Sequence, residues 1–168
     1  ESAMADVKKV VDFDTPQQFK QMENDIISMS TRLPMAAKDI AAIYAAGGQS
    51  GIAKNELSQF AESAIKMGVA FDISAEEAGA SMAEMRAAFK FTQPQIEPWA
   101  NQINYLSNNS TQSAKKITEV VQRVGSIGEI AGFAASDLAA MSATLTAIEP
   151  EVAATGLKNL TLALVKGE

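Results

Sequence analysis

Few residues in this chain could carry chemistry, and their spacing favours structural roles. Glu76 and Glu77 form an adjacent acid pair. Neighbouring side chains on a helix point in different directions, so the two carboxylates cannot converge on one substrate. At the start of a helix they offset the positive end of the helix dipole instead. The chain has no His and no Cys, which excludes Cys or His nucleophilic triads, disulfides and zinc sites of the usual ligand types. We expect no enzymatic activity, no catalytic residues and no cofactor or metal ligands.

Two glycine-rich segments look at first like phosphate loops. Residues 47–51 read Gly-Gly-Gln-Ser-Gly, and residues 125–128 read Gly-Ser-Ile-Gly. Neither has the preceding apolar strand or the Gly-Lys-Ser/Thr ending that a P-loop requires. A helix end followed by a turn explains both segments better.

The composition is that of a globular helical protein with an acidic balance. The chain has 168 residues, 47% of them hydrophobic and only 6% aromatic, with a formal net charge of −6. A core of Ala, aliphatic residues and Met is therefore expected. Its few basic residues are scattered, which argues against contact with nucleic acid through phosphate neutralisation. No segment has the length and apolarity of a membrane span or signal peptide.

A short phrase recurs along the chain and predicts where helices begin. It consists of an apolar residue, a cap-like residue, two spacers, an acidic or amide residue and a second apolar residue. A hydroxyl at the second position can accept a hydrogen bond from the backbone N–H of the residue three positions later. The acidic or amide side chain of that later residue can in turn accept a hydrogen bond from the backbone N–H at the second position. The phrase occurs at Ile52–Leu57, Ile73–Ala78, Phe91–Ile96 and Phe133–Leu138, and in a shortened form at Asp14–Phe19. Such a phrase indicates a scaffold of similar capped helices.

The phrase and the apolar periodicity predict an all-α fold, a compact multi-helix domain of about seven or eight short capped helices. The seventh helix is expected to run from Ala134 to Ile148, after a Gly-punctuated link or short helical turn. Four of the other helices begin near Thr15, Ala53, Ser74 and Thr92, and the remaining three carry the apolar residues from Ile40 to Tyr44, from Ile117 to Val124 and from Val152 to Val165.

Two regions are expected along the chain. Residues 1–32 form an N-terminal arm and the first helix, and residues 33–168 form the helical core domain. The arm carries a β-like run, Val7–Phe13, which we interpret as a loosely attached segment because no partner strand is evident. The first residue is Glu, which suggests a fragment of a longer protein.

The spacing of these signals indicates internal repetition. The full phrases begin at Ile52, Ile73, Phe91 and Phe133, so the last interval is twice the first. Two Gly-containing segments also resemble each other in their spacing. One constant offset along the sequence relates Ile40, Gly48 and Gly51 to Ile117, Gly125 and Gly128. The period matches no solenoid consensus.

Trp99 and Tyr105 lie on or near one apolar helix stripe. We interpret them as core residues, with a partner-binding surface as the alternative, because Trp and Tyr are favoured interface anchors.

The order of these motifs from about Leu33 to Val165 resembles the core region of the phage tail tape measure proteins of the TP901 family. The motifs are Gly51–Leu57, Ile73–Ala78, Phe91–Gln93, Asn108–Ser113, Val124–Gly125, Ala131–Phe133 and Ala154–Leu157, followed by Leu160, Leu162 and Leu164. The chain departs from the family pattern at Glu149–Glu151 and Lys115–Lys116.

The resemblance implies a structural role in the virion tail, assembled in the bacterial cytoplasm. Such proteins resemble rulers that set tail length, and many are linked to passage of DNA into the host. The implied partners are other copies of the tape measure chain, tail tube proteins and tail assembly proteins. A non-enzymatic helical adaptor outside a tail is the alternative. A wall-degrading enzyme is disfavoured because His and Cys are missing.

Overall fold

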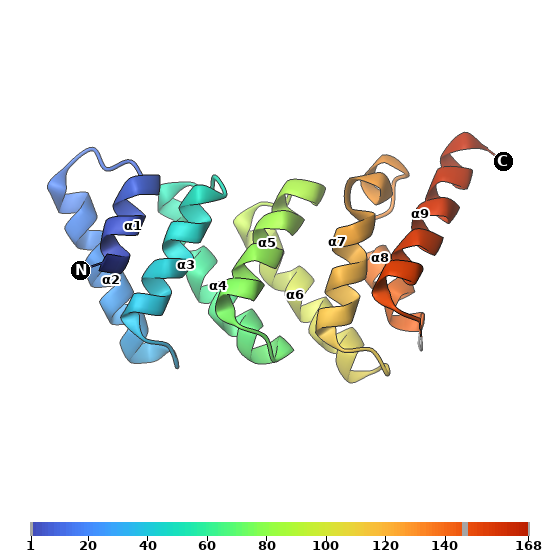
Figure 1. The fold of residues 1–168 in the computed structure, drawn as a ribbon, viewed down its shortest axis with the longest axis horizontal. Coiled ribbons are helices and arrows are strands. Elements are labelled where there is room, and N and C mark those ends of the chain that lie inside the picture. The colour runs from blue at the N-terminus through green and yellow to red at the C-terminus, as the bar shows by residue number, and fades with distance from the viewer. Residues whose placement is uncertain (1, 146–147, 168) are drawn as a thin grey trace. The chain divides into compact units, whose positions relative to one another are not determined.

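The computed structural model describes residues 2–145 and 148–167, and Figure 1 shows that these residues form an all-α fold, as the sequence predicts. Within these ranges there are nine α-helices and one 3-10 turn, η1. The helices are α1 Ser2–Val10, α2 Pro16–Arg32, α3 Ala37–Gln49, α4 Leu57–Phe71, α5 Ala75–Phe89, α6 Gln93–Asn108, α7 Ala114–Ile130, α8 Ala135–Thr144 and α9 Pro150–Lys166, with η1 at Lys54–Glu56.

Residues 2–10 form a packed helix where the sequence leads us to expect a loose arm. Val7 and Val11 are buried, and α1 contacts α3. The β-like interpretation of the Val and Lys run is wrong, because β-branched residues carry only a weak bias against helix, which packing overrides. α1 also explains why the described residues contain one helix more than the eight expected.

Several helix starts follow the predicted capping chemistry. The Thr15 hydroxyl accepts the Gln18 N–H at 3.3 Å, and the Ser113 hydroxyl accepts the Lys116 N–H at 3.3 Å. At α6, the side-chain oxygen of Gln95 accepts the backbone N–H of Thr92 at 2.8 Å. These bonds satisfy amides that a helix start leaves without intrahelical partners.

The predicted seventh helix is shorter than expected. α8 ends at Thr144, and Leu145 is its C-cap. Residues 146–147, which the prediction included, lie outside the described residues, and Ile148 lies in a bend.

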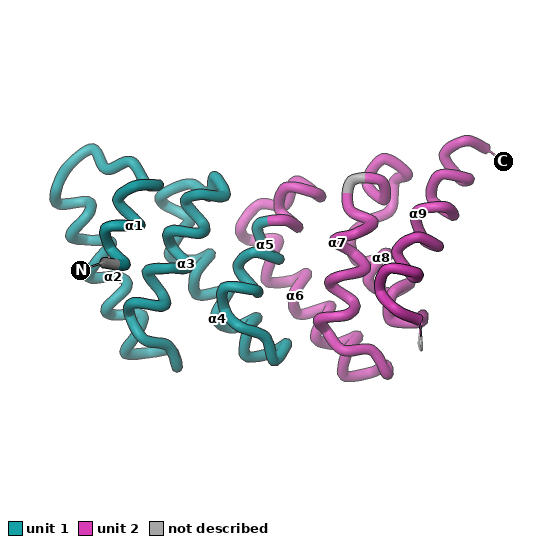
Figure 2. The backbone as a smooth tube through the Cα atoms, viewed as in Figure 1, with its two compact units in different colours: residues 1–83 teal, residues 84–168 magenta. Residues whose placement is uncertain are grey.

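The chain divides into two compact units, residues 1–83 and residues 84–168, drawn in two colours in Figure 2. The sequence-based division into 1–32 and 33–168 remains a prediction. Its boundary coincides with the end of α2 at Arg32.

In the first unit, α3 is the central helix. It contacts α1, α2 and α4. Ile40, Ile43 and Tyr44 are buried on α3, and Phe60 is buried on α4. Gly47 lies so close to α4 that a Cβ there would come within 2.9 Å of a Leu57 methyl carbon. The small residue therefore lets the two helices approach.

In the second unit, α7 has the same central position. It contacts α6, α8 and α9. Ile117, Val120, Val121 and Val124 form its buried stripe. The predicted helix end at Gly125 is a kink, with φ 42° and ψ −125°, after which the helix continues to Ile130.

The recurring phrase has a structural basis beyond capping. The residue before each full phrase adopts a left-handed conformation: Gly51 at φ 80°, Asp72 at φ 56°, Lys90 at φ 53° and Gly132 at φ 81°. Such a residue ends the preceding helix. The apolar residue that follows it can donate its N–H to a carbonyl in the last turn of the preceding helix, and its side chain can pack against an apolar residue in the first turn of the next helix. One six-residue phrase thus encodes a complete helix-to-helix joint.

Candidate functional site

The described residues offer no obvious catalytic or metal centre. No group of three or more acidic side chains that could hold a metal ion occurs among them. The Glu77 backbone N–H donates to the Ser74 hydroxyl at 3.0 Å, which places Glu77 in the first turn of α5 as a capping element. No helix in the described part of the chain is long and apolar enough to cross a membrane. The candidate sites are therefore surfaces and polar junctions.

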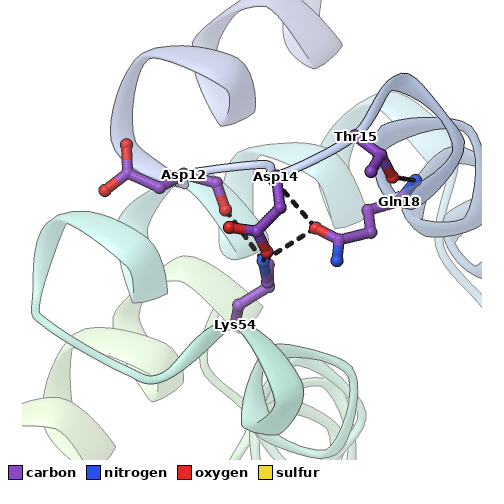
Figure 3. A network of polar contacts seen from close by, with 5 residues as sticks. All are labelled: Asp12, Asp14, Thr15, Gln18 and Lys54. Atoms are coloured by element: carbon purple, nitrogen blue, oxygen red, sulfur yellow. Dashed lines mark hydrogen bonds and ion pairs between the residues drawn. The ribbon is translucent and has the colours of Figure 1, made fainter.

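One polar junction with several hydrogen bonds centres on Lys54 (Figure 3). Its ammonium group donates to the Asp14 carboxylate at 2.9 Å, to the Gln18 side-chain oxygen at 2.9 Å and to the Asp12 backbone carbonyl at 3.1 Å. The Asp14 backbone N–H donates to the same Gln18 oxygen at 3.0 Å. One cation thus ties the α1–α2 connection to η1.

The electrostatics of this junction favour the charged form of Asp14. Its hydrogen bond from Lys54 is the main cause that lowers its pKa, with a further contribution from Gln18. Lys54 also lies 6.0 Å from the centre of the Phe13 ring, which packs edge-on against Phe19. Every polar contact here is internal to the first unit, so the junction holds the fold in place.

The two aromatic residues singled out in the sequence have different surroundings. Trp99 is buried, with 3% of its surface exposed. Tyr105 is 67% exposed and borders a hollow of about 390 Å³. The hollow is lined by Asn101, Gln102, Tyr105, Leu106, Ser136 and Ala140. The core interpretation holds for Trp99, whereas Tyr105 is available for a partner.

The largest concentration of exposed apolar side chains lies on α9. Of eleven large exposed apolar residues among those described, five are on this helix: Val152, Leu160, Leu162, Leu164 and Val165. A helix that is apolar on most sides of its last turns is typical of a buried position. The sequence did not single out this surface, because the same leucines read equally well as core residues.

Comparisons with known proteins identify the family. The family model for "Phage-related minor tail protein" matches residues 23–168. A "Probable tape measure protein" of Halomonas phage phiHAP-1 is 35% identical over 182 aligned positions, which cover 99% of this chain and 21% of the relative. The chain thus spans about a fifth of that relative's length. No solved structure matches.

These findings confirm the resemblance to phage tail tape measure proteins and favour the tail interpretation over the adaptor alternative. The match to the family model begins inside α2, ten residues before the stretch that carries the resemblance in the sequence. The chain belongs to the phage-related minor tail protein family, whose members are structural components of phage tails.

Proposed function

We propose that the chain is a helical module of a tail tape measure protein, which sets tail length and supports tail assembly and DNA delivery. The observation that carries the proposal is the 35% identity to a probable tape measure protein across 99% of the chain. The relative is much longer, so the activity of the whole protein extends beyond this module.

The module acts by contact and not by catalysis. Its partners are other copies of the tape measure chain, tail tube proteins and tail assembly proteins. Its location is the virion tail, after assembly in the bacterial cytoplasm. The net charge of −6 disfavours contact with nucleic acid through phosphate groups.

The folded form suits a docking or assembly role better than a ruler. A ruler gains length most efficiently as one continuous helix, which rises about 1.5 Å per residue. Here the longest helices have 17 residues and so span only about 25 Å each. Because the chain is divided into short helices that pack on one another, it gains less length per residue than one continuous helix would.

The test is an in-frame deletion of residues 33–165 from the parent phage gene, with tails examined by electron microscopy. We expect absent or aberrant tails. Tails that assemble normally but are shorter by about 200 Å, the length of one continuous helix over the deleted residues, would show that the segment is part of the ruler. Normal tails with normal infection would contradict the proposal.

A smaller deletion in register with the repeat serves as a matched control. Removing residues 15–91 joins Asp14 to Thr92, so that a Thr cap with an amide three residues later is kept at the new junction. A ruler would shorten by about 115 Å. A docking module should fail to assemble tails although the shortened protein is still made, which immunoblotting of infected cells would check.

A further inference from the structure

A hollow of about 490 Å³ lies in the first unit, bordered by the start of α3, the end of α4 and the α4–α5 joint. Ile65 is buried at its wall and Ile73 is half-buried, whereas Val69 is 68% exposed. Among the described residues of this unit, Val69 is the most exposed large apolar side chain. A lone exposed apolar residue is ordinary, but one that lines a hollow with other apolar residues offers a site for a partner's side chain.

The backbone of the α4–α5 joint holds one edge of this hollow in place. The N–H groups of Asp72 and Ile73 both donate to the Gly68 carbonyl, the second at 3.0 Å. A Cβ at Gly68 would lie 3.0 Å from the Ile73 carbonyl oxygen, so the joint lies close against α4. A preorganised edge of this kind lowers the conformational entropy that is lost when a partner binds.

The border of the hollow is negatively charged. Asp39, Asp72 and Glu76 line it, with no Lys or Arg among the described lining residues. None of the three carboxylates forms an ion pair with another residue that the structure describes. The adjacent Lys38 lines a different hollow.

The helix ends at the hollow leave most of this charge in place. Asp39 and Glu76 lie in the first turns of α3 and α5, where each meets a positive helix end of about half a charge. The end of α4 adds about half a negative charge, since α4 has no basic residue in its last turn. The hollow therefore keeps an excess of about two negative charges.

We propose that this hollow binds a basic and apolar segment of another protein. An apolar side chain of that segment packs against Val69 and Ile73. Lys or Arg residues beside it pair with the carboxylates of Asp39 and Asp72, and these opposite charges speed association and fix the orientation of the segment.

The charge of the hollow disfavours the other occupants. A second copy of the chain carries a net charge of −6, and nucleic acid phosphates and anionic lipids are negative as well, so all three are repelled. A metal ion is disfavoured because no group of three or more acidic side chains among the described residues could hold one.

Site-specific photo-cross-linking in cells infected by the parent phage tests the proposal. A photoreactive amino acid replaces Val69 in the full-length protein, and mass spectrometry identifies the captured segment. We expect a segment of another protein in which an apolar residue lies within about one helical turn of two or more Lys or Arg residues. The matched control has the same photoreactive amino acid at Ile130 on α7, which is 75% exposed and lies outside this hollow. It should not capture that segment.

Capture of no protein would overturn the proposal. So would capture of a second copy of this chain, or of a segment with no excess of Lys and Arg. The inference goes beyond the tail role, because it concerns the chemistry of one surface. Failed capture would therefore leave the proposed function standing, while normal tails in the deletion phage would leave the binding surface standing.

Fluorescence anisotropy with the captured segment as a synthetic peptide tests the charges on the purified chain. Asp39→Asn combined with Asp72→Asn should weaken binding by about tenfold, since two charge pairs are lost. Asn tolerates the left-handed conformation of Asp72, at φ 56°, and circular dichroism checks that the variant is folded.

The matched control for this double variant is Asp12→Asn combined with Asp25→Asn. It makes the same charge change at two exposed carboxylates outside the hollow, and the affinity should change by less than about twofold. Equal weakening by both double variants would overturn the proposal, because the overall charge of the chain and not this hollow would then attract the peptide.

Discussion

The α3–α4 joint and the α7–α8 joint have the same backbone hydrogen bonds, but the helices that lead into them differ in the number of residues between an earlier glycine and the joint. In the first, the Ile52 N–H donates to the Gly47 carbonyl at 3.0 Å. In the second, the Phe133 N–H donates to the Gly128 carbonyl at 3.0 Å. The left-handed residues that precede Ile52 and Phe133 have φ angles of 80° and 81°. The joint is thus a local unit that recurs in the chain, and the α4–α5 joint has it too, where the Ile73 N–H donates to the Gly68 carbonyl at 3.0 Å.

The difference lies in the number of residues between each joint and an earlier glycine, which faces the end of α1 in the first unit and α5 in the second. Gly48 faces Val10 and Val11, and Gly51 follows it by three residues. Gly125 faces Ala88, and Gly132 follows it by seven. Four extra residues make slightly more than one helical turn of about 3.6 residues.

The kink at Gly125 accommodates this insertion. A four-residue insertion in a straight helix would rotate the joint by about 40° relative to the buried face. The backbone of Gly125, at φ 42° and ψ −125°, interrupts the helix where the insertion begins. The comparison indicates that a joint tolerates inserted residues where a glycine with non-helical backbone angles compensates for the rotation of the helix.

The largest effect should come from removing the apolar residue that locks each joint. Leu57 and Leu138 are both fully buried and lie at equivalent positions in the phrase. We expect Leu57→Ala and Leu138→Ala each to lower the free energy of unfolding by about 2–5 kcal/mol. Denaturant unfolding followed by circular dichroism measures both.

Val69→Ala is the control for these two substitutions. Its side chain is 68% exposed, so its loss should stay within about 0.5 kcal/mol. If one Leu variant lost several kcal/mol and the other behaved like this control, the two joints would not be energetically equivalent.

The glycines should separate steric crowding from backbone strain. A Cβ at Gly128 would lie 2.5 Å from a Leu138 methyl carbon, so Gly128→Ala should cost about 1–3 kcal/mol. A Cβ at Gly132 would meet nothing within 4 Å, and Gly132→Ala should cost only the left-handed strain of about 1–2 kcal/mol. Gly47 and Gly51 should follow the same order, because their surroundings match.

Urea midpoints of the four Ala variants measure this ordering. Should the open glycines cost more than the crowded ones, strain would dominate the joints and packing would be secondary.

The sequence predicted the joints well because their chemistry is local. The caps at Thr15 and Ser113 need only neighbours within one turn. Ala134 shows the limit of the phrase. It has no hydroxyl, yet its N–H still donates to the Asp137 carboxylate at 3.1 Å, so half of the motif suffices.

Long-range packing accounts for what the sequence could not predict. α1 was missed because its helical state depends on the burial of Val7 and on packing against α3, which lies far from α1 along the chain. The exposure of Leu160 was missed for the converse reason. Nothing in its local pattern distinguishes it from Leu157, which lies one turn earlier on the same helix and is buried. Periodicity shows that a face is apolar but does not show what covers it.

The smallest effect should come from the Lys54 junction, which lies in the first unit. The α7–α8 joint has no counterpart, because Ala135 takes the position of Lys54 in its phrase. The pKa of Asp14 is lowered in the folded chain by its hydrogen bond from Lys54. The stabilisation is therefore present above the unfolded pKa of about 3.9 and is lost as pH falls through the lower folded value. Because Asp14 is exposed, the effect should be small and reduced by salt.

Asp14→Asn should be slightly less stable than the wild type at neutral pH, and the two stabilities should converge as the pH falls below about 4. Thermal unfolding at a series of pH values measures the difference. Asp12→Asn is the matched control, since Asp12 contacts Lys54 through its backbone carbonyl and keeps that contact after substitution. A difference between Asp14→Asn and wild type that persists unchanged to the lowest pH would mean that the charge of the Asp14 carboxylate is irrelevant to the stability of the junction.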